Sequence, residues 1–401
     1  MVALNNILSV AHYERKLLLR SWFFRVFAVL VVVAFVAINM ATLSDVGMST
    51  WLYRAIPSTI PYFNLTLLNV AQAVIAIFLS ADFIKRDKQL DTSEVFYVRP
   101  LSNAEYVLGK TWGNLSVFFF LNFVMLLLVY FFNTTASNTY VDFSSYIVYF
   151  LLITVPTLLF IMGLSFCVML ILNNQALTFI VLLGYIALTL FYIQGKWDYV
   201  FDYMAYGLPM FRSTVLGFTD PFKLLSLRIL YILLGAGCIC LTVYLFKRLP
   251  HSPAQKYLFL FLALGFFFLS GIIAVHHVMN FKGDIEERRQ MVALNDEFGD
   301  SPLMLVDEYD LTIEQKGSGI SVEAVMFAIA QESASKYLFT LNPALKISSV
   351  HTLDGRDLQY ERNHHLLFVD MGRVLSVDDT VQLVVEYAGQ IDENICYLDM
   401  S

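Results

Sequence analysis

Charged residues are scarce in this sequence. Asp, Glu, Lys and Arg make up 15% of the 401 residues, whereas 58% of the residues are hydrophobic. An ordinary soluble domain is closer to a quarter charged and half apolar. The apolar surplus is too great for one buried core, so the composition predicts an integral membrane protein.

Cysteine is rare as well. Three of the four cysteines fall within apolar runs and the fourth stands alone near residue 396, so they form neither a disulfide framework nor a metal-ligand set. Two pairs of adjacent histidines occur, His276-His277 and His364-His365. The second pair falls in a predicted strand or turn, where adjacent side chains of a strand would face opposite sides and form no chelate. We expect no metal site and no cofactor bound by the chain.

Two catalytic motifs are missing from the sequence. It contains no G-x-x-x-x-G-K-[ST] phosphate loop and no H-E-x-x-H zinc motif. We therefore expect that the chain is not itself an enzyme. Its apolar runs also contain no Asp or Glu, which argues against a carrier that relays protons through acidic residues.

The few charges are unevenly distributed. Residues 1–277 contain 17 Lys and Arg against 11 Asp and Glu, and residues 278–401 contain 9 against 22. The acidic final part would repel nucleic acid, and the basic residues of the first part lie at the ends of apolar runs rather than along one face. We therefore expect no binding of nucleic acid.

Long apolar runs are what the sequence has in abundance. Crossing a bilayer takes about 20 apolar residues. Six runs contain no Asp, Glu, Lys or Arg: 26–44, 55–81, 111–141, 143–195, 229–246 and 257–281. The run 143–195 would be roughly 80 Å long as one helix, and Asn173-Asn174-Gln175 near its middle predicts a turn between two helices. The sequence thus predicts about seven transmembrane helices.

The basic residues of the connections predict the orientation of these helices. Lys and Arg are retained on the cytoplasmic side of a membrane. A cytoplasmic N-terminus places twelve of them in cytoplasmic segments and five in external ones. With seven spans, the C-terminal part then lies on the periplasmic or extracellular side. We expect a multi-pass protein of the cell inner (plasma) membrane.

The first 22 residues form a separate element in this prediction. Apolar residues recur at helical spacing between residues 4 and 22, and Arg15, Lys16 and Arg20 are available for lipid headgroups. The pattern predicts a helix along the cytoplasmic interface over residues 1–22. A poorly ordered lead-in to the first span is the alternative.

The longest cytoplasmic connection, residues 85–110, combines charge with an apolar patch. Its charged start is followed by Val95-Phe96-Tyr97-Val98, then by Pro100, and then by Ser102-Asn103-Ala104-Glu105, which matches a helix-capping box. The pattern favours a short cytoplasmic helix that offers apolar side chains to a partner. A solvated loop with no partner is the alternative.

These features together resemble the membrane subunit of ABC-2 type transporters, over about residues 1–248. The resemblance includes the interfacial helix, Arg99-Pro100, Gly109-Lys110 at the start of the third span, the turn at Asn173-Asn174 and the long external connection after the fifth span. It implies a six-helix ABC-2 type transmembrane domain at residues 23–248, followed by a seventh helix at 249–280.

The resemblance also implies partners. Two permease subunits, forming a homodimer or a heterodimer, would work with separate ABC ATPase subunits, and ATP would act only through those subunits. The residues that would couple the chain to the ATPase are Glu94, Val95, Phe96, Tyr97, Arg99 and Pro100. Closure of the ATPase would then shift the spans as rigid bodies.

Two further groups of residues lie toward the membrane interior or its outer face. The connection 196–227 is rich in aromatic residues and predicts short re-entrant or interfacial helices at the outer leaflet, with an ordinary aromatic belt as the alternative.

Polar side chains within membrane spans are energetically costly, so those that occur there are expected to have a role. We therefore expect Asn69, Gln72 and Asn122 to line a path or to form a packing contact between helices.

The final part of the chain changes from helical to strand periodicity. A charged helical linker is expected at residues 281–302, followed by six or seven short strands within 303–401, with a hairpin turn at Asp354-Gly355. This predicts an extracytoplasmic all-β sandwich. The segments KYLFTLNPALKISSVHTLDGRDLQYER and VQLVVEYAGQI resemble the N-terminal β-sandwich domain of M1-family aminopeptidases. We expect this domain to be incomplete, as a fragment of a peptidase fusion or with the peptidase part lost or encoded separately.

The sequence therefore favours the permease subunit of an ATP-driven ABC-2 type transporter. Two alternatives stay open: a membrane-anchored module that presents the external domain to a partner or peptidase, and a secondary carrier. Neither the substrate nor the direction of transport can be read from the residues.

Overall fold

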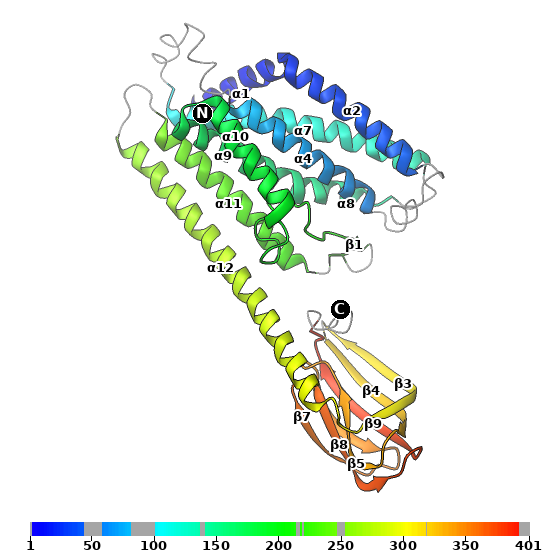
Figure 1. Ribbon diagram of the computed structural model, residues 1–401. Helices are drawn as coiled ribbons and strands as arrows, with labels where there is room; N and C mark the ends of the chain where they lie inside the picture. Colours follow the sequence, from blue (N-terminus) through cyan, green and yellow to red (C-terminus); the bar gives the residue numbers. More distant parts are fainter. Residues whose placement is uncertain are drawn as a thin grey trace. The chain divides into compact units, whose positions relative to one another are not determined.

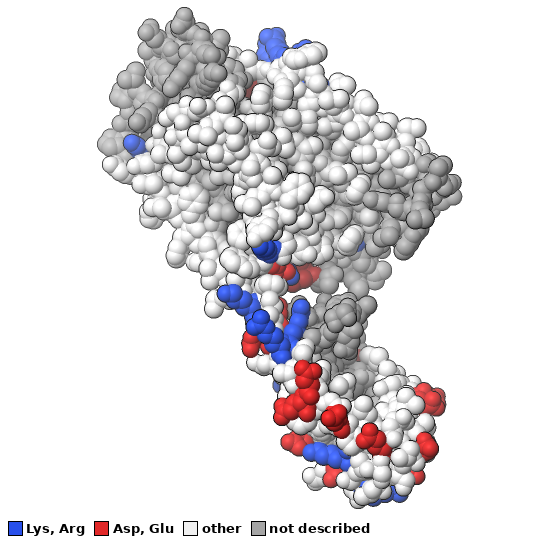
Figure 2. All heavy atoms as spheres, in the orientation of Figure 1, with Lys and Arg blue, Asp and Glu red and all other residues white. Residues whose placement is uncertain are grey.

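The computed structural model describes residues 2–43, 58–81, 101–136, 141–213, 217–218, 220–246, 253–317 and 319–392. The chain forms two compact units, which divide between Val278 and Met279 (Figure 1). On the face drawn in Figure 2, the helical unit is nearly free of charged atoms, whereas acidic atoms gather on the second unit. This agrees with the uneven charge of the sequence.

The helical unit is built from long apolar helices. Its elements, with the helix that leads into the second unit, are α1 (Val2–Arg20), α2 (Trp22–Leu43), α4 (Thr59–Ala81), α7 (Asn103–Ala136), α8 (Phe143–Tyr149), η1 (Phe150–Thr154), α9 (Val155–Leu172), α10 (Gln175–Leu188), η2 (Thr189–Ile193), α11 (Pro221–Leu245) and α12 (Pro253–Phe298). Within the described ranges, seven helices are long and apolar enough to cross a membrane. The predicted number of long apolar helices is therefore confirmed.

The breaks between these helices have local causes. Asn173 adopts a left-handed conformation (φ 51°) that ends α9, and the side chain of Asn174 accepts a hydrogen bond from the Leu177 amide to begin α10. Asn tolerates this conformation better than most residues. Pro156 has no amide hydrogen, and the preceding turn widens into the π-helix η1. The turn predicted at Asn173-Asn174 is confirmed.

The helices extend beyond the charge-free runs, which corrects one expectation. The charge-free run 229–246 predicts a sixth span that begins after Arg228, yet α11 begins at Pro221 and buries Arg228. Arg25 and Lys110 likewise lie within α2 and α7. Arg228 and Lys110 are accommodated because each has polar partners inside the protein.

The main core cluster of the helical unit is formed mainly by α2, α4, α7 and α9, with smaller contributions from α10 and α11. The backbones of α9 and α11 approach closely where two glycines face each other, because a Cβ atom on Gly163 would lie 2.7 Å from the carbonyl oxygen of Gly235. Small residues permit this kind of approach between apolar helices. A larger side chain at either position would separate the two helices.

The second unit contains two antiparallel sheets in its described part. The strands are β3 (Met304–Lys316), β4 (Gly319–Ala330), β5 (Ala334–Thr340), β6 (Lys346–Thr352), β7 (Gln359–Asn363), β8 (Leu366–Leu375) and β9 (Thr380–Gly389). One sheet has the order β3-β4-β9-β6 and the other β5-β8-β7. Side chains from both sheets, such as Val350, Val369 and Leu383, form one core. The predicted number of strands is confirmed, but β3 and β4 are not short, with 13 and 12 residues.

The turn at Asp354-Gly355 does not join two strands of one sheet, as a simple hairpin would. A single antiparallel bridge links His351 to Asp357 around the turn, and the chain then crosses from β6 in one sheet to β7 in the other. The sequence signal identifies a tight turn, since Gly355 has φ 83°. It does not identify the sheet in which the next strand pairs.

The last turns of α12 pack onto the sheets within the second unit. Nε2 of His365 lies 2.7 Å from Oδ1 of Asn295, Nε2 of His364 lies 3.4 Å from Glu287, and the ring of Phe298 contacts that of Phe368. The second histidine pair therefore contributes to the contact between helix and sheet.

Candidate functional site

The helix α1 packs along the first turns of α7 through two glycines. A Cβ atom on Gly109 would lie 2.7 Å from Cβ of Val10, and one on Gly113 would lie 2.8 Å from the carbonyl oxygen of Ala11. Both distances are shorter than normal contacts, so only glycine permits this approach. Residues 109–113 thus form a G-x-x-x-G face on which α1 lies.

A buried ion pair lies beside this glycine face. Nζ of Lys110 is 2.9 Å from Oε1 of Glu14, and the two side chains are only 1% and 4% exposed. The same ammonium group lies 5.0 Å from the centre of the Tyr106 ring. Because a buried charge without a partner is very costly, α1 and α7 are held in one register.

The start of α7 is capped and joined to two other elements. Ser102 Oγ accepts a hydrogen bond from the Glu105 amide (3.1 Å), and the Glu105 carboxylate accepts one from the Ser102 amide (2.7 Å). This confirms the predicted capping box. Asn6 of α1 donates to Glu105 (3.2 Å), and Asn103 donates to the carbonyl of Phe246 at the end of α11 (2.7 Å). The residues that follow the segment 82–100 are therefore fixed to both α1 and α11.

Some of the predicted site residues can be placed in the structure and others cannot. Arg15, Lys16 and Arg20 lie exposed on α1. The proposed coupling residues lie outside the described part of the chain: Glu94, Val95, Phe96, Tyr97, Arg99 and Pro100. The described chain resumes at residue 101, directly before the capped start of α7, and that start contacts α1 through the hydrogen bond from Asn6 to Glu105.

A second polar region lies around residues 194–211, which we call the closing segment. It is built from consecutive turns, so the expected short helices are absent from the described residues there. Left-handed conformations at Trp197, Asp198 and Tyr199 are incompatible with a right-handed helix. The prediction of helices is therefore wrong for these residues, and the segment instead buries Tyr203 and Met204 completely while Trp197 stays exposed.

Arg228 and Asp202 anchor the closing segment in the helical unit. The guanidinium of Arg228 donates to the carbonyl of Asp202 (2.7 Å) and to that of Tyr203 (3.3 Å). The Asp202 carboxylate accepts hydrogen bonds from three backbone amides of residues 206–208, at 2.7 to 3.0 Å. Both side chains are at most 1% exposed, and these hydrogen bonds offset part of the cost of burying their charges, although Nε of Arg228 has no partner among the described residues.

Asp198 connects the same segment to two helices. Its Oδ2 atom lies 2.5 Å from Nζ of Lys223 in α11 and 3.1 Å from Nε2 of His277 in α12. Burial raises the pKa of the Asp198 carboxyl, but hydrogen bonds from His277 and Lys223 and the charge of Lys223 outweigh this effect and hold the pKa below its ordinary value. The carboxylate is therefore ionised at neutral pH.

The three polar residues selected from the spans belong to one hydrogen-bonded network. Asn122 donates to Gln72 (2.6 Å), Gln72 donates to Asn69 (2.9 Å), and Asn69 donates to the carbonyl of Met204 in the closing segment (2.7 Å). Thr154 and Thr157 extend the network to η1 and α9. All three predicted residues are fully buried, and their hydrogen bonds join α4, α7 and α9 to the closing segment.

Sequence reasoning missed four residues of these regions: Glu14, Gly113, Asp202 and Arg228. The G-x-x-x-G spacing from 109 to 113 was available as a signal. The predicted orientation includes Arg228 among its five external basic residues, because Arg228 directly precedes the apolar run 229–246. Nothing in the local sequence shows that its partners are backbone carbonyls of a distant turn.

No cluster of three or more His, Cys, Asp or Glu side chains with the geometry to hold a metal ion occurs among the described residues.

No protein-family profile matches the chain, and no curated protein matches it. Partial likeness exists to solved structures, among them a two-domain M1 zinc metallopeptidase variant bound to L-tryptophan, at 20% identity, covering 23% of this chain and 21% of that chain with a TM-score of 0.21. An M1 zinc metallopeptidase from Deinococcus radiodurans gives 20% identity, the same coverages and a TM-score of 0.20. The chain spans about a fifth of the length of these structures, and scores this low assign no activity to it.

Proposed function

We propose that this chain is the membrane subunit of an ATP-driven transporter of the ABC-2 type, which moves a substrate across the cytoplasmic membrane by coupling to a separate ATPase. Its seven long apolar helices would form the membrane part, with α1 on the cytoplasmic surface. The two-sheet unit after residue 303 would lie on the other side of the membrane.

The attachment of α1 to the start of α7 carries this proposal. The segment 82–100 leads directly into the capped end of α7, and that end is fixed to α1 by the glycine face, the Glu14–Lys110 pair and the Asn6–Glu105 hydrogen bond. A movement imposed on the segment by an ATPase would therefore move α1 and α7 together. Asn103 would carry the movement to the end of α11.

The opposite end of α11 supports a transporter over a mere anchor. There the closing segment is held by Arg228, by the Asp198 ion pairs and by the network that includes Asn69. An anchor needs apolar helices but has no need of buried charges that join the helices to a polar segment, because each such charge is costly. A transporter needs a closed external end whose contacts are specific.

The test is whether an ATPase accompanies the protein. The tagged full-length chain is purified in mild detergent from its native cells, and vanadate-sensitive ATP hydrolysis and an ABC ATPase subunit are sought in the preparation. We expect both with the wild type and neither with Phe96→Asp or Tyr97→Asp. Tyr360→Asp, an exposed aromatic of β7, is the matched control. A wild-type preparation without an ATPase subunit, from membranes that contain the protein, would favour the anchored module or the secondary carrier.

A further inference from the structure

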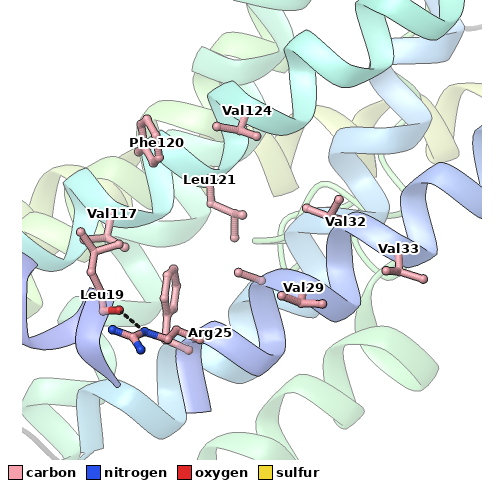
Figure 3. Close-up of a pocket in the computed structure, with 11 residues that line it drawn as sticks. Leu19, Arg25, Val29, Val32, Val33, Val117, Phe120, Leu121 and Val124 are labelled. Carbon is pink, nitrogen blue, oxygen red and sulfur yellow. Dashed lines mark hydrogen bonds between the residues drawn. The ribbon is translucent and has the colours of Figure 1, made fainter. Parts of the chain in front are cut away.

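An apolar groove of about 550 Å³ lies between α2 and α7 on the surface of the helical unit. In Figure 3, the labelled side chains of Val29 and Val32 from α2 and of Leu121 and Val124 from α7 point toward the space between the two helices. Leu121 lies buried at the bottom, while Val29 and Phe120 are each 62% exposed along the edges. In a membrane, a groove of this kind has to be filled by apolar groups.

One end of the groove carries a positive charge. Arg25 lines the groove, and its Nε atom donates a hydrogen bond of 2.9 Å to the carbonyl oxygen of Leu19, across the break between α1 and α2 (Figure 3). Within the described chain this bond engages only Nε, so the terminal nitrogens Nη1 and Nη2 are available as donors. A guanidinium held in this way can bind a phosphate through two parallel hydrogen bonds.

The position of Arg25 fits a lipid headgroup. Arg25 belongs to the first turn of the apolar helix that begins at Trp22, which is the depth at which headgroups meet the hydrocarbon. In Figure 2, basic atoms lie where Figure 1 places the turn between α1 and α2. Anionic lipids concentrate in the cytoplasmic leaflet, where the N-terminus is expected.

We propose that the groove between α2 and α7 is a binding site for an anionic phospholipid, with one acyl chain along the valines and the phosphate on Arg25. A second copy of the chain would match only the apolar part of the groove. A phospholipid matches both the groove and its charged end. This proposal rests on one part of the proposed function, namely that the helical unit is inserted in a membrane. It does not depend on an ATPase partner.

Lipid retention tests the proposal. The full-length protein is reconstituted in vesicles of equal parts phosphatidylglycerol and phosphatidylcholine, extracted in mild detergent and measured by native mass spectrometry. We expect wild type to retain phosphatidylglycerol in preference to phosphatidylcholine. Arg25→Gln should lower the retained phosphatidylglycerol about tenfold, a loss of one charge-assisted contact, and Val29→Trp should lower it by filling the groove.

Two controls and a second measurement keep the outcome clear. Arg289→Gln removes an exposed charge elsewhere, and Ile180→Trp adds the same side chain on an exposed face of α10, so neither should change retention. Unchanged phosphatidylglycerol in both groove variants would overturn the proposal. So would a Val29→Trp protein that becomes monomeric in light scattering while keeping its lipid, because the groove would then receive a second copy. Failure of the protein to enter membranes would instead contradict the proposed function.

Discussion

Glu14 of α1 and Lys110 of α7 form an ion pair of 2.9 Å in which both side chains are buried. The pair lies beside two glycines that bring the helix backbones close together. Helix α1 is thereby integrated into the helical unit. It is amphipathic by sequence, yet its buried side, with Val10, Ala11 and Glu14, is covered by protein.

Replacing one partner of this pair should lower the stability of the fold more than replacing both. Breaking a buried ion pair costs about 3–5 kcal/mol, whereas replacing both members with apolar residues of similar size is often neutral. We therefore expect Lys110→Met to restore much of the thermal stability that Glu14→Leu removes, as measured by the unfolding midpoint of the purified protein. Additive losses in a double-mutant cycle would show that the pair does not hold the two helices together.

The glycine face predicts a position-specific effect of side-chain size. Gly113→Val would place carbon atoms where the backbone of Ala11 and the side chain of Glu14 lie, so α1 should separate from α7. A cysteine at Ala11, buried in the wild type, should then react with a thiol reagent.

Gly265 in α12 is the matched control, because no atom lies within 4 Å of a Cβ built there. Gly265→Val should leave the cysteine protected. Equal reactivity in both variants would mean that the close approach at Gly113 has no role in holding α1.

The features that could be predicted from sequence are those set by neighbouring residues. The capping box at Ser102 and Glu105, the turn at Asn173-Asn174 and the long apolar helices depend on local chemistry. The contacts of Arg228 could not be predicted, because its acceptors are carbonyls about 25 residues away that are positioned by the closing segment. The coupling residues around Phe96 stay a prediction from sequence.

The Asp198 cluster predicts how stability depends on pH. A carboxyl whose folded-state pKa is lowered stabilises the fold above its unfolded-state pKa, about 3.9, and this contribution is lost as the pH falls through the lower folded-state value. Asp198→Asn should therefore lower the unfolding midpoint at neutral pH, and the difference from the wild type should shrink below about pH 4.

The measurement is a series of thermal unfolding curves across that pH range. Asp300→Asn, in the exposed turn after α12, serves as the control and should have little effect at any pH. A difference between wild type and Asp198→Asn that stays constant with pH would contradict the role of the ionised carboxylate.

Arg228 should keep the closing segment folded against the helices. Arg228→Leu keeps the helix but removes the donors to Asp202 and Tyr203, and it leaves those buried carbonyls with fewer partners, at a cost of about 1–3 kcal/mol for each unsatisfied group. We expect faster cleavage by chymotrypsin at the aromatic residues of the segment. The control variant Leu225→Met, on the exposed side of the same helix, should be cleaved by chymotrypsin at the wild-type rate. Identical rates in both variants would show that other contacts suffice.

The hydrogen bond from Asn6 to Glu105 joins residues 99 positions apart in the chain. Helix α1 thus meets its partner only after α2, α4 and the start of α7 have been made. Until then its buried face, including Glu14, lacks the protein surface that covers it in the finished fold. The packing of α1 consequently has to wait for the synthesis of α7, and a chain whose translation stops before Gly113 lacks the helix surface that buries α1.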